Sequence, residues 1–241
     1  MPNEITISII SATYNVAPTL PQLIESLRRQ TCKNFEWIVA DGGSSDGTLE
    51  ILQSVNDLNI KFTSGKDFGI YDALNTALKG CSGEYYLVLG GDDTLENDAI
   101  ENFSRVANSS HADLVVFNIL ENQRVIQHNA NRSPLMRQRG FVAGHSVGTL
   151  IKKNLHSALG FYSKKFPIAA DYYFLERAYI SGAHIHYENI IAGSFGKAGV
   201  SSTDRLGALT ESFRMRVDLG GNKIVEMVVF ILRFIWNFRN L

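Results

Sequence analysis

The sequence predicts an α/β fold in which a mostly parallel central sheet is flanked by helices. Between residues 5 and 120, short apolar runs rich in β-branched and aromatic residues alternate with segments whose apolar residues recur at helical spacing. Nearly continuous apolar runs are typical of strands buried on both faces. Strands that alternate with helices are joined by right-handed crossovers and lie parallel in one sheet. The 241 residues, 45% of them hydrophobic, suffice for one large core.

Five strands and four helices are expected in this first part of the chain. The strands are the runs ITISIISA (5–12), FEWIVA (35–40), IKFTS (60–64), EYYLVLG (84–90) and DLVVFNIL (113–120). The helices are expected at 20–27, 48–55, 73–80 and 96–110, where apolar residues share one helical face. Ligands of such sheets gather where the strands end. The segments that follow the strands are therefore the candidate site.

After about residue 120 the pattern loosens. The segment 124–146 mixes basic, polar, glycine and proline residues, which predicts a strand or hairpin followed by long surface excursions. Helical spacing returns at 169–183, a further strand is expected at 184–195, and a Gly/Ser loop follows at 196–204. We expect one domain over 1–220, with halves 1–120 and 121–220, and a separate helix over 221–241.

The C-terminal segment KIVEMVVFILRFIWNFRNL (223–241) predicts an amphipathic helix. Glu226, Arg233, Asn237 and Asn240 form a narrow polar stripe, and apolar residues cover nearly all the rest. The apolar span is shorter than the roughly 20 residues needed to cross a bilayer, so the helix should lie on a surface. A membrane interface and an oligomer or core contact are the alternatives. The basic residues and the tryptophan of this segment favour an anionic membrane surface.

Composition excludes several classes of protein. The formal net charge of −1 argues against a nucleic-acid-binding protein held by bulk electrostatics. The two cysteines, Cys32 and Cys81, lack the spacing of a redox or metal motif, so we expect both to be reduced and structural. The first residues lack the basic start and long apolar stretch of a signal peptide, which predicts a cytoplasmic protein or one on the cytoplasmic face of the inner membrane.

Three polar clusters follow predicted strands. They are the residues around Thr13 and Asn15, the segment ADGGSSDGT with Asp41 and Asp46, and GGDD (90–93). Asp41 directly follows a buried strand and is placed to accept a hydrogen bond from a nucleobase or a ribose hydroxyl. Asp46 fits a tight turn as well as it fits a binding site. No GxxxxGK[ST] or GxGxxG motif occurs, so the charge of a bound phosphate calls for another partner, such as a divalent cation.

The adjacent acids Asp92 and Asp93 suit a hard cation. Mg²⁺ takes oxygen ligands, and proteins usually lend it one or two carboxylates while substrate phosphates supply others. Neighbouring side chains diverge in an extended segment, so we expect unequal roles, with Asp93 on the metal and Asp92 toward the sugar or ribose. The two glycines before them let a bulky ligand approach the backbone.

The segments ISIISATYN, VADGGSSDGTLEIL, DFGIYDALNTALKGCSGEYYLVLGGDDTL and AADYYFLERA together resemble the family 2 glycosyltransferases, whose fold is of the GT-A type. The resemblance is dense over residues 5 to about 100 and resumes around Asp171. It implies inverting transfer of a sugar from a nucleotide diphosphate sugar to an acceptor hydroxyl, with Mg²⁺ or Mn²⁺ as cofactor. A basic and aromatic C-terminal helix at a membrane would fit a glycan or lipid-linked sugar as acceptor, by analogy with bacterial surface polysaccharide assembly.

The resemblance also implies roles for single residues. Asp171 matches the catalytic base, and Asp92 and Asp93 match the metal-binding motif, whose first position is here Gly91. The residues that match donor contacts, together with the turn candidate of the second cluster, are Thr13, Asn15, Asp41, Asp46, Asp67, Asp72 and Asn75.

Several alternatives stay open. Without the resemblance, Asp171 is a candidate helix cap. His145 is a candidate for a contact to the donor phosphate or the acceptor, or a structural residue. Lys197 and Arg205 flank a loop that either closes over a pyrophosphate or is solvated. The rival functions are a nucleotidyltransferase, expected to carry a Gly-rich loop with a basic residue after the first strand, and a non-catalytic sugar-nucleotide-binding scaffold.

Overall fold

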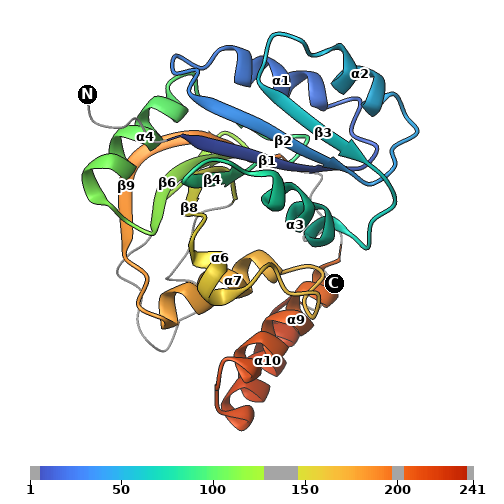
Figure 1. Ribbon diagram of the computed structural model, residues 1–241. Coiled ribbons are helices and arrows are strands. Elements are labelled where there is room, and N and C mark those ends of the chain that lie inside the picture. The colour runs from blue at the N-terminus through green and yellow to red at the C-terminus, as the bar shows by residue number, and fades with distance from the viewer. Residues whose placement is uncertain (1–5, 128–145, 197–203, 238–241) are drawn as a thin grey trace.

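A mixed β-sheet runs through the centre of the protein and carries helices on both faces (Figure 1). The computed structural model describes residues 6–127, 146–196 and 204–237. In this part of the chain the strand order is β3-β2-β1-β4-β8-β6-β9-β5, and β7 pairs with β6. The strands are β1 (Ile7–Thr13), β2 (Phe35–Asp41), β3 (Ile60–Ser64), β4 (Tyr85–Val88), β5 (Thr94–Leu95), β6 (Leu114–Glu121), β7 (Arg124–Ile126), β8 (Thr149–Lys152) and β9 (Ile185–Ser194).

Each face of the sheet has its own apolar core. The helices are α1 (Leu20–Arg28), α2 (Thr48–Ser54), α3 (Ile70–Gly80), α4 (Ala99–Ser110), α6 (Leu155–Leu159), α7 (Ala170–Ile180), α9 (Arg205–Asp218) and α10 (Lys223–Asn237), with a 3-10 turn at Ser146–Gly148. Helices α1 and α4 pack against Ile9 and Trp37 on one face. Helices α3 and α7 pack with Ile10 and Ile38 on the other. Successive strand residues point to opposite faces, so the continuous apolar runs of β1 and β2 supply both cores.

The first four strands form a parallel sheet, as the sequence predicts. Strand β1 lies between β2 and β4, β2 pairs with β3, and all three pairings are parallel. The register places Thr13 of β1 beside Asp41 of β2, and Asp41 beside Ser64 of β3. The segments that follow these three strands therefore leave the sheet at one edge.

The second half of the sheet is mixed. Strand β8 is antiparallel to its neighbours β4 and β6, whereas β9 is parallel to β6. The segment expected to begin with a strand or hairpin begins with the short strand β7, which pairs antiparallel with β6. Helix α9 was not predicted. Its buried side chains are Glu211 and Met215, so its sequence carries no apolar stripe that would reveal a helix.

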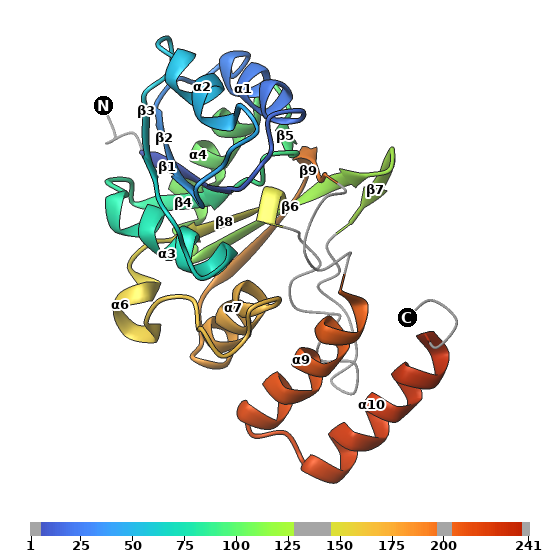
Figure 2. The ribbon, with the colours of Figure 1, turned by 90° about the vertical axis from the view of Figure 1, so that its right-hand side faces the viewer.

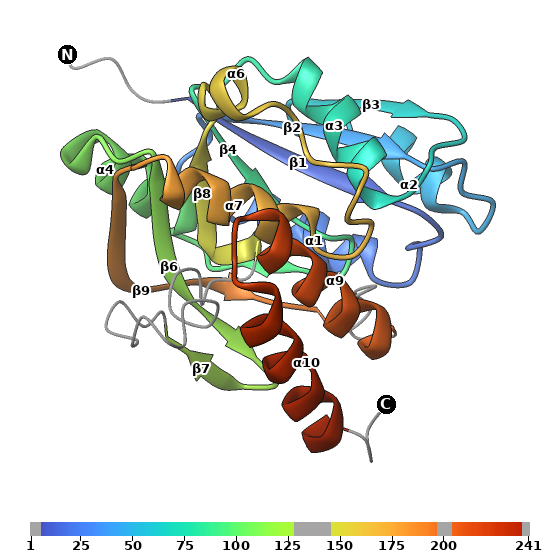
Figure 3. The same cartoon turned by 90° about the horizontal axis from the view of Figure 1, so that it is seen from below.

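Helices α9 and α10 form a hairpin in which α9 lies between α7 and α10 (Figures 2 and 3). Arg216 of α9 pairs with Glu226 of α10 at 3.0 Å, and Arg233 donates to Ser212 at 3.3 Å. The outer face of α10 exposes large apolar side chains, which are Ile224, Val225, Met227, Val228, Ile231, Leu232, Ile235 and Trp236. Within the described residues, no helix combines the length and apolarity needed to cross a membrane.

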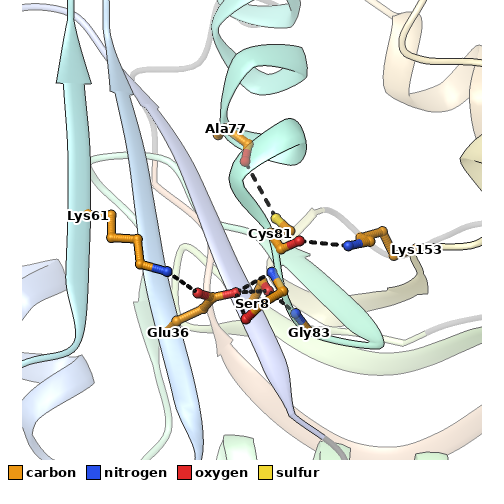
Figure 4. Close-up of polar contacts among 8 residues, drawn as sticks. Ser8, Glu36, Lys61, Ala77, Cys81, Gly83 and Lys153 are labelled. Carbon is orange, nitrogen blue, oxygen red and sulfur yellow. Dashed lines mark hydrogen bonds and ion pairs between the residues drawn. The ribbon is translucent and has the colours of Figure 1, made fainter.

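A buried carboxylate joins the opposite, amino ends of the parallel strands (Figure 4). Oε1 of Glu36 accepts hydrogen bonds from the Ser8 hydroxyl at 2.7 Å and from the amide and hydroxyl of Ser82, and Oε2 accepts from Lys61 at 3.1 Å. Burial opposes ionisation of Glu36, but these donors outweigh it and lower its pKa to about 2. The charged side chain thus links β1, β2, β3 and the turn before β4.

Replacing Glu36 with glutamine should lower the free energy of unfolding by about 2–3 kcal/mol at pH 7. The amide would turn an N–H toward existing donors and would remove the charge that Lys61 faces. The pKa of about 2 in the folded state lies below the ordinary value of 4.5. The stabilisation is therefore complete above the ordinary value and is lost as pH falls toward about 2.

Chemical denaturation at pH 7 and pH 3 measures this effect, and the difference between wild type and Glu36→Gln is expected to narrow at pH 3. The control is Glu84→Gln, which removes an exposed ion pair with Lys152. It should change stability by less than about 1 kcal/mol. A difference of equal size at both pH values would contradict the ionised state of Glu36.

Candidate active site

Asp41, the last residue of β2, is buried and accepts five hydrogen bonds. Its Oδ1 accepts from the amides of Gly43 and Ser44, at 3.0 and 2.9 Å, and from the Ser64 hydroxyl at 2.8 Å. Its Oδ2 accepts from the hydroxyls of Thr13 and Ser44, at 3.0 and 2.5 Å. Burial opposes ionisation, but the donors outweigh it and the pKa of Asp41 lies below its ordinary value. The charged carboxylate fixes the loop that follows β2.

Asn15 and Asp46 join the loops that follow β1 and β2. The side chain of Asn15 accepts from the Ser45 amide at 2.9 Å, and its backbone has a φ of 52°, which asparagine tolerates well. Asp46 accepts from the Ala17 amide at 3.0 Å and from the Thr48 hydroxyl at 2.6 Å. The hydrogen bond from Thr48 lowers the pKa of Asp46. The structure therefore gives Asp46 the turn geometry that was one of its two interpretations.

Asp67 and Asp72 lie where the chain passes from β3 to α3. Asp67 is half-buried and accepts from the Gly69 amide at 2.9 Å. A Cβ on Gly42 would lie 2.8 Å from Oδ2 of Asp67, so glycine at this position lets the two loops touch. Asp72 pairs with Lys164 at 2.9 Å, and this contact lowers the pKa of Asp72.

Asn75 is buried and is engaged by the backbone of Tyr162. Its amide nitrogen donates to the Tyr162 carbonyl, and its carbonyl oxygen accepts from the Tyr162 amide, both at 3.0 Å. This reciprocal pair anchors the segment before α7 on α3. The structure thus shows a structural use for a residue that the sequence places among the donor contacts.

The two adjacent acids differ sharply in their surroundings. Asp93 is 2% exposed, and it accepts from the amides of Gly90 at 2.6 Å and Gly196 at 2.8 Å, one at each oxygen. Burial raises its pKa to about 7 in spite of these two amides. Asp92 is only half-buried and lies against Gly196, where a Cβ would come within 2.1 Å of its carboxylate. Asp93 therefore joins two loops, and Asp92 is the more accessible acid.

Packing accounts for the glycine that stands at the first position of the acidic motif. A Cβ on Gly91 would lie 2.9 Å from Cβ of Val16, which follows β1. Any larger residue at position 91 would therefore displace the loop that carries Asn15. An acid at this position is incompatible with the backbone as it stands.

The carboxylate oxygens of Asp92 and Asp93 suit a cation whose remaining ligands come from a bound substrate. No group of three histidine, cysteine, aspartate or glutamate side chains able to hold a metal occurs among the described residues. Two carboxylates, Asp92 and Asp93, stand side by side, and the second is a buried acid whose ionisation is not fully compensated. One or two protein carboxylates with further oxygens from a phosphate ligand is the usual arrangement for Mg²⁺.

Asp171 lies in the first turn of α7 and is half-buried. Its Oδ1 accepts from the Tyr71 hydroxyl at 2.7 Å and from the Tyr172 amide at 2.8 Å. No hydrogen bond from the described residues reaches Oδ2. Within this part of the chain, the carboxylate is thus held through one of its two oxygens. His145 and Lys197 lie outside the described residues, and Arg205 opens α9.

The sequence of this protein matches a known protein family over most of its length. Residues 8–166 match the family described as Glycosyl transferase family 2. The chain belongs to this family. The match covers the loops around Asp41, Asp72 and Asp93 and ends before Asp171.

Relatives of this family 2 glycosyltransferase include enzymes of several bacteria. The chain is 27% identical over 235 residues to a PGL/p-HBAD biosynthesis glycosyltransferase of Mycobacterium tuberculosis (strain ATCC 25618 / H37Rv), and the match covers 94% of this chain and 89% of that protein. It is 40% identical over 97 residues to a chondroitin synthase of Escherichia coli, a match that covers 39% of this chain and 14% of the synthase.

Solved structures share the fold. S. aureus TarS has a TM-score of 0.72 and 22% identity, and the match covers 95% of this chain and 43% of that one. The TarS fragment 1–349 with UDP-GlcNAc has a TM-score of 0.68 and 23% identity, with 79% of this chain and 58% of the fragment covered. The mannosyltransferase PcManGT from Pyrobaculum calidifontis, in complex with GDP-Man and Mn²⁺, has a TM-score of 0.69 and 17% identity, with coverage of 90% and 65%. The family resemblance and the GT-A fold predicted from the sequence are confirmed.

The sequence alone misses partners that shape the glycosyltransferase site. Ser44 and Ser64 complete the shell of Asp41, and Tyr71 holds Asp171. Tyr71 sits in an apolar helical pattern, where its hydroxyl carries no separate signal. Ser64 ends a strand and Ser44 follows one, as predicted site residues do, and this position is the signal that could have found them.

Proposed function

We propose that the protein transfers a sugar from a nucleotide diphosphate sugar to an acceptor hydroxyl with inversion, and that Asp171 is the base. The observation that carries the proposal is the asymmetry of the Asp171 carboxylate, one oxygen held by Tyr71 and Tyr172 and the other without a hydrogen bond from the described residues. A carboxylate oriented in this way can take the proton of an incoming hydroxyl at Oδ2. The new bond to the sugar forms as the bond to the diphosphate breaks, so one displacement inverts the anomeric centre.

The nucleoside is proposed to lie on the loops that follow β1, β2 and β3. Asp41 is expected to act mainly by fixing the loop after β2, since both its oxygens already accept from protein donors. Direct contacts to the nucleoside are then expected from two more exposed residues on the same loops, Asn15 and Asp67. The nucleotides seen with structural neighbours, UDP-GlcNAc on TarS and GDP-Man on PcManGT, are the first donors to test.

Asp92 is proposed as the main protein ligand of Mg²⁺ or Mn²⁺, with Asp93 behind it. This reverses the order expected from the sequence, because Asp93 is buried and engaged by two glycine amides while Asp92 is accessible. A bound cation would offset the negative charge that develops on the departing diphosphate. Through this cation, the two acids would hold the donor's phosphates near the end of β4.

The acceptor is proposed to be a glycan or lipid-linked sugar, reached at an anionic membrane surface by the outer face of α10. The charged residues inside this helix, Glu226 and Arg233, face α9 and leave the outer face apolar. Trp236 is 87% exposed and Lys223 is exposed at the start of the helix. An apolar face with tryptophan and flanking cations is typical of helices that lie in a membrane interface.

Replacing Asp171 with asparagine should leave donor binding intact and lower turnover by about 10²–10⁴-fold, because the amide cannot take a proton. Release of UDP or GDP from UDP-GlcNAc and GDP-Man measures turnover, with water or an added sugar as acceptor, and calorimetry with UDP and Mn²⁺ measures binding. Asp113→Asn, which removes an acid remote from the site, is the control. An unimpaired rate would refute the base assignment. A wild type that binds nucleotide but never turns over a donor would favour the scaffold reading.

Replacing Asp92 with alanine should abolish the metal dependence of UDP binding, so that dissociation constants with and without Mn²⁺ become equal. Asp98→Ala, which removes a nearby exposed acid, should keep the dependence. Asp93→Asn should lower the melting temperature, because its amide group would face the N–H of Gly90 or Gly196. If Asp92→Ala retains metal-dependent binding while Asp93→Asn loses it, Asp93 is the principal ligand.

Replacing Leu232 and Ile235 with serine should prevent sedimentation with vesicles that contain phosphatidylglycerol. Both side chains are exposed, at 62% and 66%, on the outer face of α10. The control replaces Val125 and Ile180, which are exposed on other elements, with serine, and should sediment like the wild type. The contrary result is a wild type that fails to bind vesicles and forms a dimer that is lost in the Leu232/Ile235 variant. That result would show that the outer face of α10 contacts a second copy of the chain instead.

A further inference from the structure

We propose that Tyr71 and Glu211 are positioning residues for the reaction, holding Asp171 from opposite sides. The inference rests on the proposed role of Asp171 as the base. Tyr71 comes from α3, in the half that carries the donor loops, and Glu211 comes from α9, in the C-terminal hairpin. Each makes hydrogen bonds to the start of α7, where Asp171 lies.

Tyr71 holds the side chain of Asp171. Its hydroxyl lies 2.7 Å from Oδ1 of Asp171 and 2.9 Å from the carbonyl oxygen of Ile168, and the residue is 8% exposed. Burial and the charge of Asp171 raise the pKa of Tyr71 well above its ordinary value, so the phenol keeps its proton and remains a donor. A hydrogen bond to a charged acceptor is stronger than one to a carbonyl. The proton therefore points toward Asp171.

Glu211 holds the backbone that leads to Asp171. Its Oε2 accepts from the amides of Ile168 and Ala169, both at 3.0 Å, and the residue is 5% exposed. The first amides of a helix have no partner inside the helix, and Ala169 at the cap position of α7 makes no side-chain cap. Glu211 supplies the acceptor from another helix. It serves the cap residue and the residue before it, and so fixes the segment that enters α7.

The two contacts meet on one residue, Ile168. The amide of Ile168 donates to Glu211, and its carbonyl lies within reach of Tyr71. Three residues later, the side chain of Asp171 is fixed through Oδ1 alone. The backbone and the side chain of the base are thus both constrained, which leaves Oδ2 in one orientation. Small displacements of a reacting group cost large factors in rate, so loss of either contact should be visible in turnover.

A purely structural role makes a different prediction from a positioning role. If Tyr71 and Glu211 only stabilise the fold, their loss should lower stability and leave turnover per folded molecule unchanged. If they orient the base, their loss should lower kcat and leave donor binding and KM for the donor nearly unchanged. In an Asp171→Asn background, where no base remains to be oriented, their loss should cost nothing further.

The variants are Tyr71→Phe and Glu211→Gln, which keep the size of each side chain. We expect each to lower kcat for release of UDP or GDP from the donor by about 5–50-fold, with calorimetric binding of UDP and Mn²⁺ within about twofold of wild type. The matched control is Tyr162→Phe. The ring of Tyr162 lies 5.6 Å from that of Tyr71, and its equally buried hydroxyl contacts Tyr86, not Asp171. It should keep the wild-type kcat.

The residual rate of Asp171→Asn, followed with radiolabelled donor, completes the cycle. Addition of Tyr71→Phe or Glu211→Gln to that variant should change the residual rate by less than about twofold. A wild-type kcat in both single variants, or an equal loss in Tyr162→Phe, would overturn the positioning role even though Asp171 remains the base. A wild-type rate in Asp171→Asn would overturn the base itself, so the two failures are distinguishable.

Discussion

The parallel half of the sheet depends on two buried, ionised carboxylates at the two ends of β2. Glu36 joins the amino ends of β1, β2 and β3 to the turn before β4, and Asp41 joins the carboxyl ends of β1, β2 and β3. Each is surrounded by hydroxyl, amide or ammonium donors that hold its pKa below the ordinary value. Buried charge stabilises a fold only when it is fully compensated. Strand β2 carries both carboxylates, and it therefore fixes the ends of the strands at which the candidate site lies.

The three buried carboxylates Glu36, Asp41 and Asp93 differ in the number of hydrogen-bond donors around them. Asp41 has five hydrogen bonds and Glu36 has four, and both are held ionised. Asp93 has two and is almost fully buried, and its pKa rises to about 7. Uncompensated burial raises the pKa of a carboxyl group, and a nearby cation would reverse that. A cation bound at Asp92, as proposed, would therefore also lower the pKa of the neighbouring Asp93.

Sequence patterns predict what is local and miss what is distant. The strands of the parallel half and helix α7 are predicted by apolar periodicity, because the apolar residues that each element buries lie next to one another in the sequence. The antiparallel placement of β8 depends on pairings that leave no local signal, and α9 escapes because its buried side chains include a glutamate. The unequal surroundings of Asp92 and Asp93 come from Gly196, about a hundred residues away, and the same distance separates Tyr71 from Asp171.

The helix that carries Asp171 is held by residues from two distant parts of the chain. Tyr71 reaches it from the donor half, and Glu211 reaches it from α9, which is also the helix on which α10 packs. One helix therefore separates α10, with its apolar outer face, from the helix that carries Asp171. A hairpin seated on a membrane would fix the direction of α7 relative to that surface, since α9 is tied to α7 by Glu211 and by the hydrogen bond from Tyr173 to Asp218. Orientation of the base and access of a membrane-bound acceptor would then depend on the same contacts.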